Sequence, residues 1–338
     1  MIHPTYDFLA IGDITIDAFI KLATPSARIA HGPRGKEEIC MNFGDKIPYE
    51  EVEVIYAVGN SPNASVAAAR LGLRSAIVTN LGQDENGDRC LARLEENGVA
   101  TEYVKRHTDI HTNYHYVLRY EEERTILIKH EHYPYALPDL PPPRWLYLSS
   151  LGENSLEHHH EIAGYLERNK DIRFAFQPGT FQIKLGADKL RDLFERAELF
   201  FCNKQEAQRI LGLGGEENMH TLLAALRERG PKIPVITDGP CGAYALESTR
   251  VLRVPMYPDP KPPVDRTGAG DSFAATVTTA LALGLDLRTA LTWGPINSMS
   301  VVQKVGAQAG LLTRDELERY LADAPEDYRV SEETLTTS

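Results

Sequence analysis

The stretch "PPVDRTGAGDSFAATVTTALALG", residues 262–284, decides how the rest of the chain is interpreted. Gly268 and Gly270 stand directly before Asp271, and an apolar run with helical spacing follows. Glycine lets a backbone come close to a ligand because it has no Cβ. The amides around Ala269 would then lie at the positive end of a helix, a position that binds anions and phosphate above all.

The acid at the start of this helix allows two interpretations. In the first, Asp271 is an ordinary helix cap that follows a flexible turn. In the second, Asp271 is a base beside a hydroxyl nucleophile, and the amides stabilise the charge on a phosphoryl group in transfer. An acid would repel a phosphate if anion binding were its whole task, a conflict that the second interpretation removes. For this motif taken alone, the helix cap remains the favoured interpretation.

The rest of the chain alternates between apolar strands and helices, most regularly after the stiff connector "LPDLPPPRW" at 137–145. This alternation predicts an α/β fold with a mainly parallel sheet covered by helices on both faces. In such sheets ligands bind outside the carboxyl ends of the strands. A tail follows at 326–338, and its last segment, "SEETLTTS" (331–338), is expected to be disordered.

Composition excludes several classes of protein. The net charge of −12 argues against a nucleic-acid partner, because a phosphate backbone needs a basic face. No window reaches the ~18 consecutive apolar residues of a membrane span, and the N-terminus does not read as a signal peptide. The 4 cysteines are far apart and form no CxxC pair. These features predict a cytoplasmic protein with reduced thiols.

Five short elements together resemble the ribokinase-like (PfkB) family of carbohydrate kinases. They are "VGNSPNASVAAARLG" (58–72) with "NLGQDENGDRCLARLEENGV" (80–99), "NKQE" (203–206), "TDGPCG" (237–242), "DRTGAGDSF" (265–273) and "KVGAQ" (304–308). They occur in the family's order, and the resemblance covers about residues 8 to 322. It implies a ribokinase-like three-layer sandwich with a mainly parallel central sheet, plus a small β-sheet lid. It also implies an ATP-dependent kinase.

The resemblance implies which residues act on the nucleotide. Asp271 would be the catalytic base, and the amides of Gly268, Ala269 and Gly270 would form the anion hole. Gly268 and Gly270 would also contact ATP, together with a further set: Asn203, Thr237, Gly239, Gly242 and Asn297. Asn297 could equally be a polar residue that caps its helix.

The same resemblance implies two cation sites. Asn203 and Glu206 would position Mg²⁺, which prefers oxygen ligands. Taken alone, Glu206 would read as an acid that favours the positive end of a helix. Asp265, Thr267 and Gly306 resemble the site at which many members of the family bind K⁺.

On the acceptor side, Asp17 matches the family acid that binds sugar hydroxyls. A carboxylate can accept hydrogen bonds from two adjacent hydroxyls, which explains an acid here. Gly59, Asn60 and Asn63 fall in the acceptor-binding block. Glu153 lies where some relatives contact the sugar, although a solvent-exposed acid would explain it equally well.

The acceptor block departs from the family pattern in two places. Val58 stands where the family commonly has a glycine, and Asn60 stands where ribokinases carry lysine. These departures put a specificity for ribose in doubt.

The predicted domain organisation is a kinase domain at 1–325, with the lid inserted as 17–58 and 108–132, and the tail beyond it. Relatives carry such a lid over the acceptor, where it excludes water that would compete for the phosphoryl group. The lid is often shared between two subunits. Because the first lid segment is long, we expect an elaborated lid or a homodimer formed through it.

The leading functional hypothesis is transfer of the γ-phosphoryl group of ATP to a primary hydroxyl of a sugar. The alternative is a nucleoside kinase that phosphorylates the ribose 5′-hydroxyl with the same machinery. A dinucleotide dehydrogenase is set aside because "AIGDITID" (10–17) lacks the G-x-G-x-x-G turn. A P-loop kinase is set aside because the chain lacks G-x-x-x-x-G-K-[ST].

Overall fold

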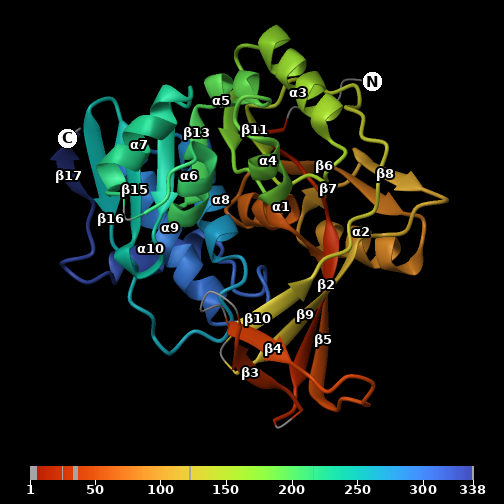
Figure 1. Cartoon of the computed structure of the whole chain (residues 1–338). Coiled ribbons are helices and arrows are strands. Elements are labelled where there is room, and N and C mark those ends of the chain that lie inside the picture. The colour runs from red at the N-terminus through yellow and green to blue at the C-terminus, as the bar shows by residue number, and fades with distance from the viewer. Residues whose placement is uncertain (1–5, 25, 33–36, 122, 216, 337–338) are drawn as a thin grey trace.

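The computed structural model describes residues 6–336 apart from 25, 33–36, 122 and 216. Residues 1–5 of the expected kinase domain and residues 337–338 of the expected tail lie outside the described residues. An 11-stranded sheet forms the centre of the molecule, and helices cover both of its faces (Figure 1). A smaller sheet of 4 strands projects from one end of it.

The central sheet is mainly parallel, as predicted. Its strands, in spatial order, are β17 (Ser331–Thr334), β16 (Arg250–Val254), β15 (Ala243–Glu247), β14 (Ile233–Thr237), β13 (Leu199–Asn203), β12 (Arg173–Phe176), β11 (Trp145–Leu148), β1 (Phe8–Ile11), β6 (Ser75–Gly82) and β7 (Val99–Ala100), with β8 (Val104–His107) paired to β6. The strands from β14 to β8 pair in parallel, and β15, β16 and β17 are antiparallel.

Two helical layers enclose this sheet. One face carries α1 (Asn60–Arg70), α2 (Glu85–Glu96), α8 (Ala269–Ala282), α9 (Leu287–Val302) and α10 (Arg314–Ala322). The other carries α3 (Leu156–Arg168), α4 (Thr180–Leu185), α5 (Arg191–Arg196), α6 (Lys204–Leu211) and α7 (Met219–Glu228). Successive side chains of a strand point to opposite faces. Phe8 of β1 therefore packs into one core and Leu9 into the other.

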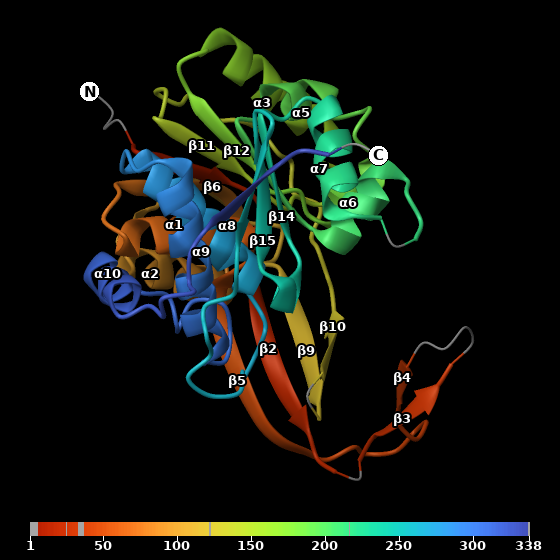
Figure 2. The ribbon, with the colours of Figure 1, turned by 90° about the vertical axis from the view of Figure 1, so that its left-hand side faces the viewer.

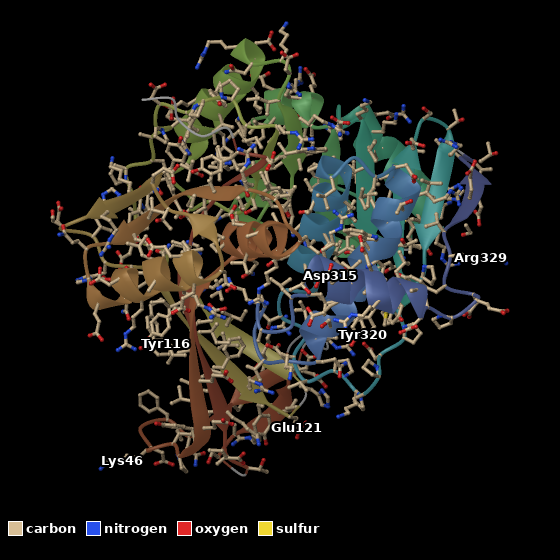
Figure 3. The ribbon with its side chains drawn as sticks, turned by 180° about the vertical axis from the view of Figure 1, so that it is seen from behind. Lys46, Tyr116, Glu121, Asp315, Tyr320 and Arg329 are labelled. Carbon is tan, nitrogen blue, oxygen red and sulfur yellow. The ribbon has the colours of Figure 1, made fainter. Side chains whose placement is uncertain are left out.

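The smaller sheet has the order β10–β9–β2–β5, and its strands lie largely in the two segments expected to form the lid, so we call this sheet the lid. Its strands are β2 (Thr15–Leu22), β5 (Tyr49–Val58), β9 (Tyr114–Tyr120) and β10 (Glu123–Leu127). A hairpin of β3 (Arg28–His31) and β4 (Glu37–Cys40) extends beyond it, away from the central sheet (Figure 2). Seen from behind, Lys46 and Glu121 lie toward the free end of the lid, whereas Asp315 and Tyr320 lie on α10 (Figure 3).

The expectation of a disordered tail is wrong for residues 331–334. They form β17, which pairs with β16 and extends the edge of the central sheet. Arg288 of α9 donates to the carbonyl of Val330 and to the carboxylate of Glu332. A short polar segment at a sheet edge can gain order from backbone pairing, which its composition does not reveal. Among the described residues, no helix combines the length and apolar character that crossing a membrane requires.

Candidate active site

Asp271 lies in the first turn of α8, next to the carboxyl ends of the parallel strands. Gly268 caps this helix with a φ of 80°. A Cβ at Gly268 would lie 2.2 Å from the Cβ of Ala307, so only glycine fits this position. A Cβ at Gly270 would meet no atom within 4 Å. Gly268 therefore shapes the turn, and Gly270 leaves open space at the positive end of the helix.

Three amide side chains hold the Asp271 carboxylate. Asn60 Nδ2 donates to Oδ1 at 2.9 Å, and Asn63 Nδ2 donates to Oδ2 at 2.9 Å, both from the start of α1. Gln177 Nε2, just after β12, donates to Oδ1 at 3.0 Å. Tyr147 of β11 donates to Gln177 Oε1, which turns the amide nitrogen toward Asp271. Residues far apart in sequence thus converge on one carboxylate.

The surroundings raise the pKa of Asp271 above its ordinary value. Burial is the largest cause, and the negative charge of Asp17 adds to it. The hydrogen bonds from Asn63 and Gln177 act in the opposite direction, because they stabilise the ionised form. A carboxyl with a raised pKa is a stronger proton acceptor than an ordinary aspartate, as a general base requires.

Two further acids line the side of the site that faces the lid. Asp17, on β2, lies with Oδ1 3.4 Å from Nδ1 of His115 on β9. Asp13, just beyond β1, is buried, and its Oδ1 and Oδ2 accept from the hydroxyl of Tyr135 at 2.9 and 2.8 Å. Gly59 caps α1 with a φ of 122°, and a Cβ there would lie 2.8 Å from the carbonyl oxygen of Asp13. This side of the site is strongly acidic.

Glu153 does not join this group of residues. Its side chain is exposed and pairs with Lys184 at 3.1 Å. The structure thus brings together Asp17, Gly59, Asn60, Asn63 and Asp271, and leaves Glu153 at the surface.

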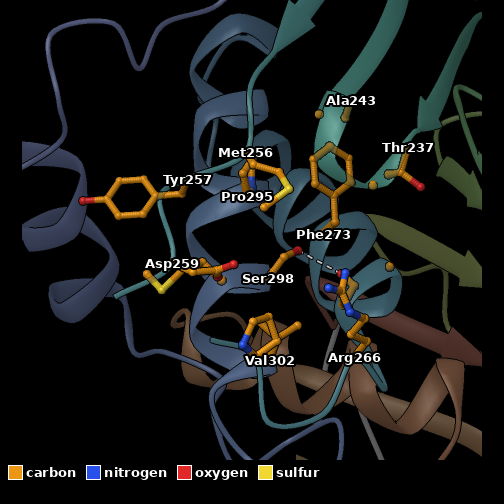
Figure 4. Close-up of a pocket in the computed structure, with 16 residues that line it drawn as sticks. Thr237, Ala243, Met256, Tyr257, Asp259, Arg266, Phe273, Pro295, Ser298 and Val302 are labelled. Carbon is orange, nitrogen blue, oxygen red and sulfur yellow. Dashed lines mark hydrogen bonds between the residues drawn. The ribbon is translucent and has the colours of Figure 1, made fainter. Parts of the chain in front are cut away.

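A cavity of about 280 Å³ lies on the other side of the α8 N-terminus (Figure 4). Ala269 and Gly270 form part of its wall, and Ser298 Oγ donates to the carbonyl of Ala269 at 2.8 Å. Its apolar lining comes from Met256, Tyr257, Phe273, Pro295, Met299 and Val302. Three of the predicted nucleotide contacts, Thr237, Gly239 and Gly242, also line it.

Asn297 does not line this cavity. Its side chain is fully buried, donates to Thr276 Oγ1 at 2.8 Å and accepts from the amide of Leu312 at 2.9 Å. These bonds tie α9 to α8 and to the segment before α10. The neighbouring Ser298 faces the cavity instead.

Asn203 and Glu206 cap the N-terminus of α6 reciprocally. Asn203 Oδ1 accepts from the Glu206 amide at 2.9 Å, and Glu206 Oε2 accepts from the Asn203 amide at 2.8 Å. Burial raises the pKa of Glu206, and the charge of Asp271 contributes to the shift. Among the described side chains no hydrogen bond engages Glu206 Oε1. A desolvated carboxylate near a second one suits a divalent cation, so the oxygen donors here fit Mg²⁺.

Asp265, Thr267 and Gly306 also come together. Asp265 Oδ1 accepts from the backbone amide and the hydroxyl of Thr267 at 3.0 and 2.7 Å. Its Oδ2 accepts from the Gly306 amide at 2.9 Å. The carboxylate thus joins the loop before α8 to the loop after α9.

Sequence reasoning missed several residues of the site. Gln177 follows a strand at its carboxyl end, where the parallel-sheet rule could have indicated it. Asp13 was visible beside Asp17, but nothing indicated its partner Tyr135. His115 and His130 lie in or near the lid hairpin, and no motif marks them.

Comparison with solved structures identifies the fold. The structure of Arabidopsis thaliana ribokinase complexed with ribose and ATP matches with a TM-score of 0.77 at 18% sequence identity, over 94% of this chain and 99% of that chain. The molecule therefore has the ribokinase fold, as its sequence predicted: a large, mostly parallel sheet flanked by helices, with a small separate sheet.

Sequence comparison identifies the family. Residues 35–314 match the family described as "pfkB family carbohydrate kinase", so the chain belongs to this family. The ribokinase of Bacillus subtilis is 29% identical over 271 residues, 78% of this chain and 87% of that protein. A nucleoside kinase of Methanothermobacter thermautotrophicus is 25% identical over 260 residues, 75% of this chain and 80% of that protein. The chain is a phosphotransferase of the sugar and nucleoside kinase class, as predicted.

Proposed function

We propose that this kinase transfers the γ-phosphoryl group of ATP to a primary hydroxyl of a sugar, with Asp271 as the general base. One observation carries the proposal. Ala269 and Gly270 line the apolar cavity, whereas the carboxylate of the next residue, Asp271, is held by Asn60 and Asn63 of the acceptor block. The base thus lies between the side suited to a nucleotide and the side suited to an acceptor.

In the proposed reaction, the acceptor hydroxyl oxygen attacks the γ-phosphorus while its proton passes to Asp271. The bond between the γ-phosphorus and the bridging oxygen breaks, and ADP leaves with the electron pair. The amides at the start of α8 stabilise the negative charge on the group in transfer. Ribose and ATP in the Arabidopsis ribokinase structure support the same pair of substrates for this fold.

The proposal includes Mg²⁺, which the oxygen donors of Glu206 and Asn203 would hold. The support is a desolvated carboxylate whose pKa responds to Asp271. When bound, Mg²⁺ neutralises phosphate charge.

The proposal also includes K⁺ near Asp265, Thr267 and Gly306. The support is that the Asp265 carboxylate accepts from the amides of Thr267 and Gly306, which brings the loop before α8 against the loop after α9. Rates measured in KCl and in NaCl at equal ionic strength test it; equal rates would contradict it.

The proposed assembly is a homodimer formed through the lid. The lid strands and the segments next to them expose large apolar side chains: Phe43, Tyr49, Val52, Tyr116, Ile126, Leu127 and Ile128. Large apolar patches on soluble proteins mark interaction sites. Sedimentation equilibrium of the wild type should give a dimer and Leu127→Asp a monomer. A monomeric wild type would contradict this assembly.

The proposed location is the cytoplasm, which suits an ATP-consuming enzyme with free cysteines.

The direct test is a panel of sugars and nucleosides, each incubated with ATP and Mg²⁺. ADP formation is followed with a coupled assay, and the product is identified by mass spectrometry. We expect acceptor-dependent ADP formation with a sugar as the best acceptor and phosphate on its primary hydroxyl. A nucleoside as the best acceptor would support the alternative function. ADP formation that no acceptor accelerates would contradict both.

A further inference from the structure

The acceptor side of the site contains two aspartate–histidine pairs. Asp17 and His115 are direct partners in the register of β2 and β9, with Oδ1 and Nδ1 3.4 Å apart. Asp13 Oδ2 lies 3.5 Å from Nδ1 of His130, which follows β10 on the path from the lid to the body. The two imidazole rings lie 5.1 Å apart. We call these four side chains the imidazole–carboxylate layer.

Neighbouring groups fix this layer in place. Phe181 of α4 meets the His130 ring edge to face, with ring centroids 5.4 Å apart. Tyr135 donates its hydroxyl to both oxygens of Asp13 and stacks on His158. The layer therefore joins the lid strands to the body of the molecule in a defined geometry.

Three polar atoms of the layer are buried without a hydrogen bond among the described residues: Asp17 Oδ1, His115 Nε2 and His130 Nδ1. Asp17 Oδ1 and His130 Nδ1 have only the long contacts of 3.4 and 3.5 Å given above, and His115 Nε2 has none. His115 itself is 9% exposed. Buried polar atoms in native proteins almost always have a partner, so unpaired ones require an explanation. These atoms lie beside Asp17, which is close enough for its negative charge to raise the pKa of Asp271. Their position therefore indicates a ligand that contacts both the layer and the catalytic base.

The chemistry of these atoms defines that ligand. A neutral imidazole with its proton on the nitrogen that faces a carboxylate presents the other nitrogen as an acceptor. Carboxylate oxygens are acceptors as well, so the layer presents mainly acceptors and matches the hydroxyl groups of a polyol. Asp13, Asp17 and Asp271 together would repel an additional anion such as a phosphate group. No group of three or more metal-ligating side chains occurs in the part of the chain that the structure describes.

We infer that His115 and His130 contact the acceptor and determine its specificity. With Asp17 and Asp13, they bind the hydroxyls of an uncharged polyhydroxylated acceptor and disfavour sugar phosphates. This inference rests on the proposed function and narrows its acceptor to an unphosphorylated compound. His115 lies on the lid itself, so acceptor binding also ties the lid to the body.

The first experiment compares D-fructose, D-ribose and adenosine with D-fructose 6-phosphate as acceptors for the wild type. An unphosphorylated compound should exceed the sugar phosphate in kcat/KM by at least about 10-fold, since one lost hydrogen bond or one repulsion is worth this much. A sugar phosphate as the best acceptor would overturn the inference while leaving the kinase function intact. Failure of every acceptor would overturn the proposed function and, with it, this inference.

The second experiment uses His115→Phe and His130→Phe, with His132→Phe as the control because His132 is exposed two residues from His130. We expect the KM of the best acceptor to rise about 10- to 100-fold in the two layer variants, as for a lost buried hydrogen bond. The KM for ATP should stay within about two-fold, and the control should match the wild type.

His115→Asn, which keeps a polar acceptor, should recover part of the affinity that His115→Phe loses. Circular dichroism and binding of a non-hydrolysable ATP analogue show that each variant is folded. Acceptor KM values within about three-fold of the wild type in both layer variants would overturn the inference. So would equal losses for acceptor and ATP, because they would make the layer structural.

Discussion

The two halves of the active site are built in different ways. The proposed nucleotide side is an apolar cavity whose shape depends on backbone conformation, with Gly239, Gly242 and Gly268 at φ values of 48°, 90° and 80°. The proposed acceptor side is a set of polar and acidic side chains that lie on the lid, on α1 and at strand ends. The first half can be recognised from short motifs, because the residues within each motif determine the conformation of the turn that they form. The second half depends on residues meeting across the fold.

This contrast has a functional consequence. A site made of backbone amides and apolar surface suits a ligand that the whole family shares. A site made of single side chains can change its specificity by substitution without altering the fold. The contrast can be tested by variants that should affect only one half.

The largest effect is expected at Asp271, where the halves meet. Asp271→Asn should lower kcat by about 10²- to 10⁴-fold, the range for a lost general base, with acceptor and ATP affinities changed much less. The new amide nitrogen would face the amide donors that now bind the carboxylate. Single-turnover rates and separate binding titrations check this. Turnover above about a tenth of wild type would make the base assignment wrong.

Next in size is Asp17→Asn, which should act on the acceptor half alone. It replaces an oxygen that accepts hydroxyls with a donor, so acceptor affinity should fall about 10- to 150-fold, as expected for a hydrogen bond to a charged group. Affinity for a non-hydrolysable ATP analogue should hardly change. Calorimetry with both ligands decides the matter, and Glu153→Gln, at an exposed acid, serves as the control. Equal losses for both ligands would assign Asp17 to the fold.

A pair of glycine variants separates backbone shape from ligand approach. Gly268→Ala should lower stability by about 1–3 kcal/mol or more, because it strains a positive φ and meets Ala307. Gly270→Ala should change stability by less than about 1 kcal/mol, since its Cβ meets open space. Its Cβ would stand where the phosphates approach, so kcat/KM for ATP should fall by about 10-fold. Thermal unfolding and initial rates check both. A Gly270→Ala enzyme with normal kinetics would contradict a close approach of phosphate there.

The smallest effect concerns pH. Asp271 must be ionised to act as a base, and its raised pKa means that activity is lost as pH falls through a value above that of an ordinary aspartate. Gln177→Leu removes a donor that stabilises the ionised form, so the acid limb of kcat/KM should move to higher pH. Gln208→Leu is the matched control, because this half-buried glutamine of α6 donates to the carbonyl of Gly215 and forms no hydrogen bond with Asp271. A shift to lower pH would contradict this account.

Much of the site could be predicted because its motifs are local. Thr237, Gly239 and Gly242 line the cavity because a strand end and the turn after it are encoded within a few residues. The resemblance placed Asn297 at the nucleotide, but its side chain bonds to Thr276, and the adjacent Ser298 faces the cavity instead. One position along a helix turns a side chain by about 100°, so spacing alone could not choose between neighbours.

By itself, the sequence determined the alternation of strands and helices, the turns at glycines and the presence of a helix that starts close to Asp271. Hydrophobic period and glycine conformation act within one or two turns of chain, and so they are readable locally. Only the tertiary structure decided which amides hold Asp271, the pairing of Asp17 with His115 and of Asp13 with His130, the exposure of Glu153 and the order of β17. Asn60 and Asp271, for example, are 211 positions apart. Such contacts depend on how whole layers pack, because no local preference of either residue specifies its distant partner.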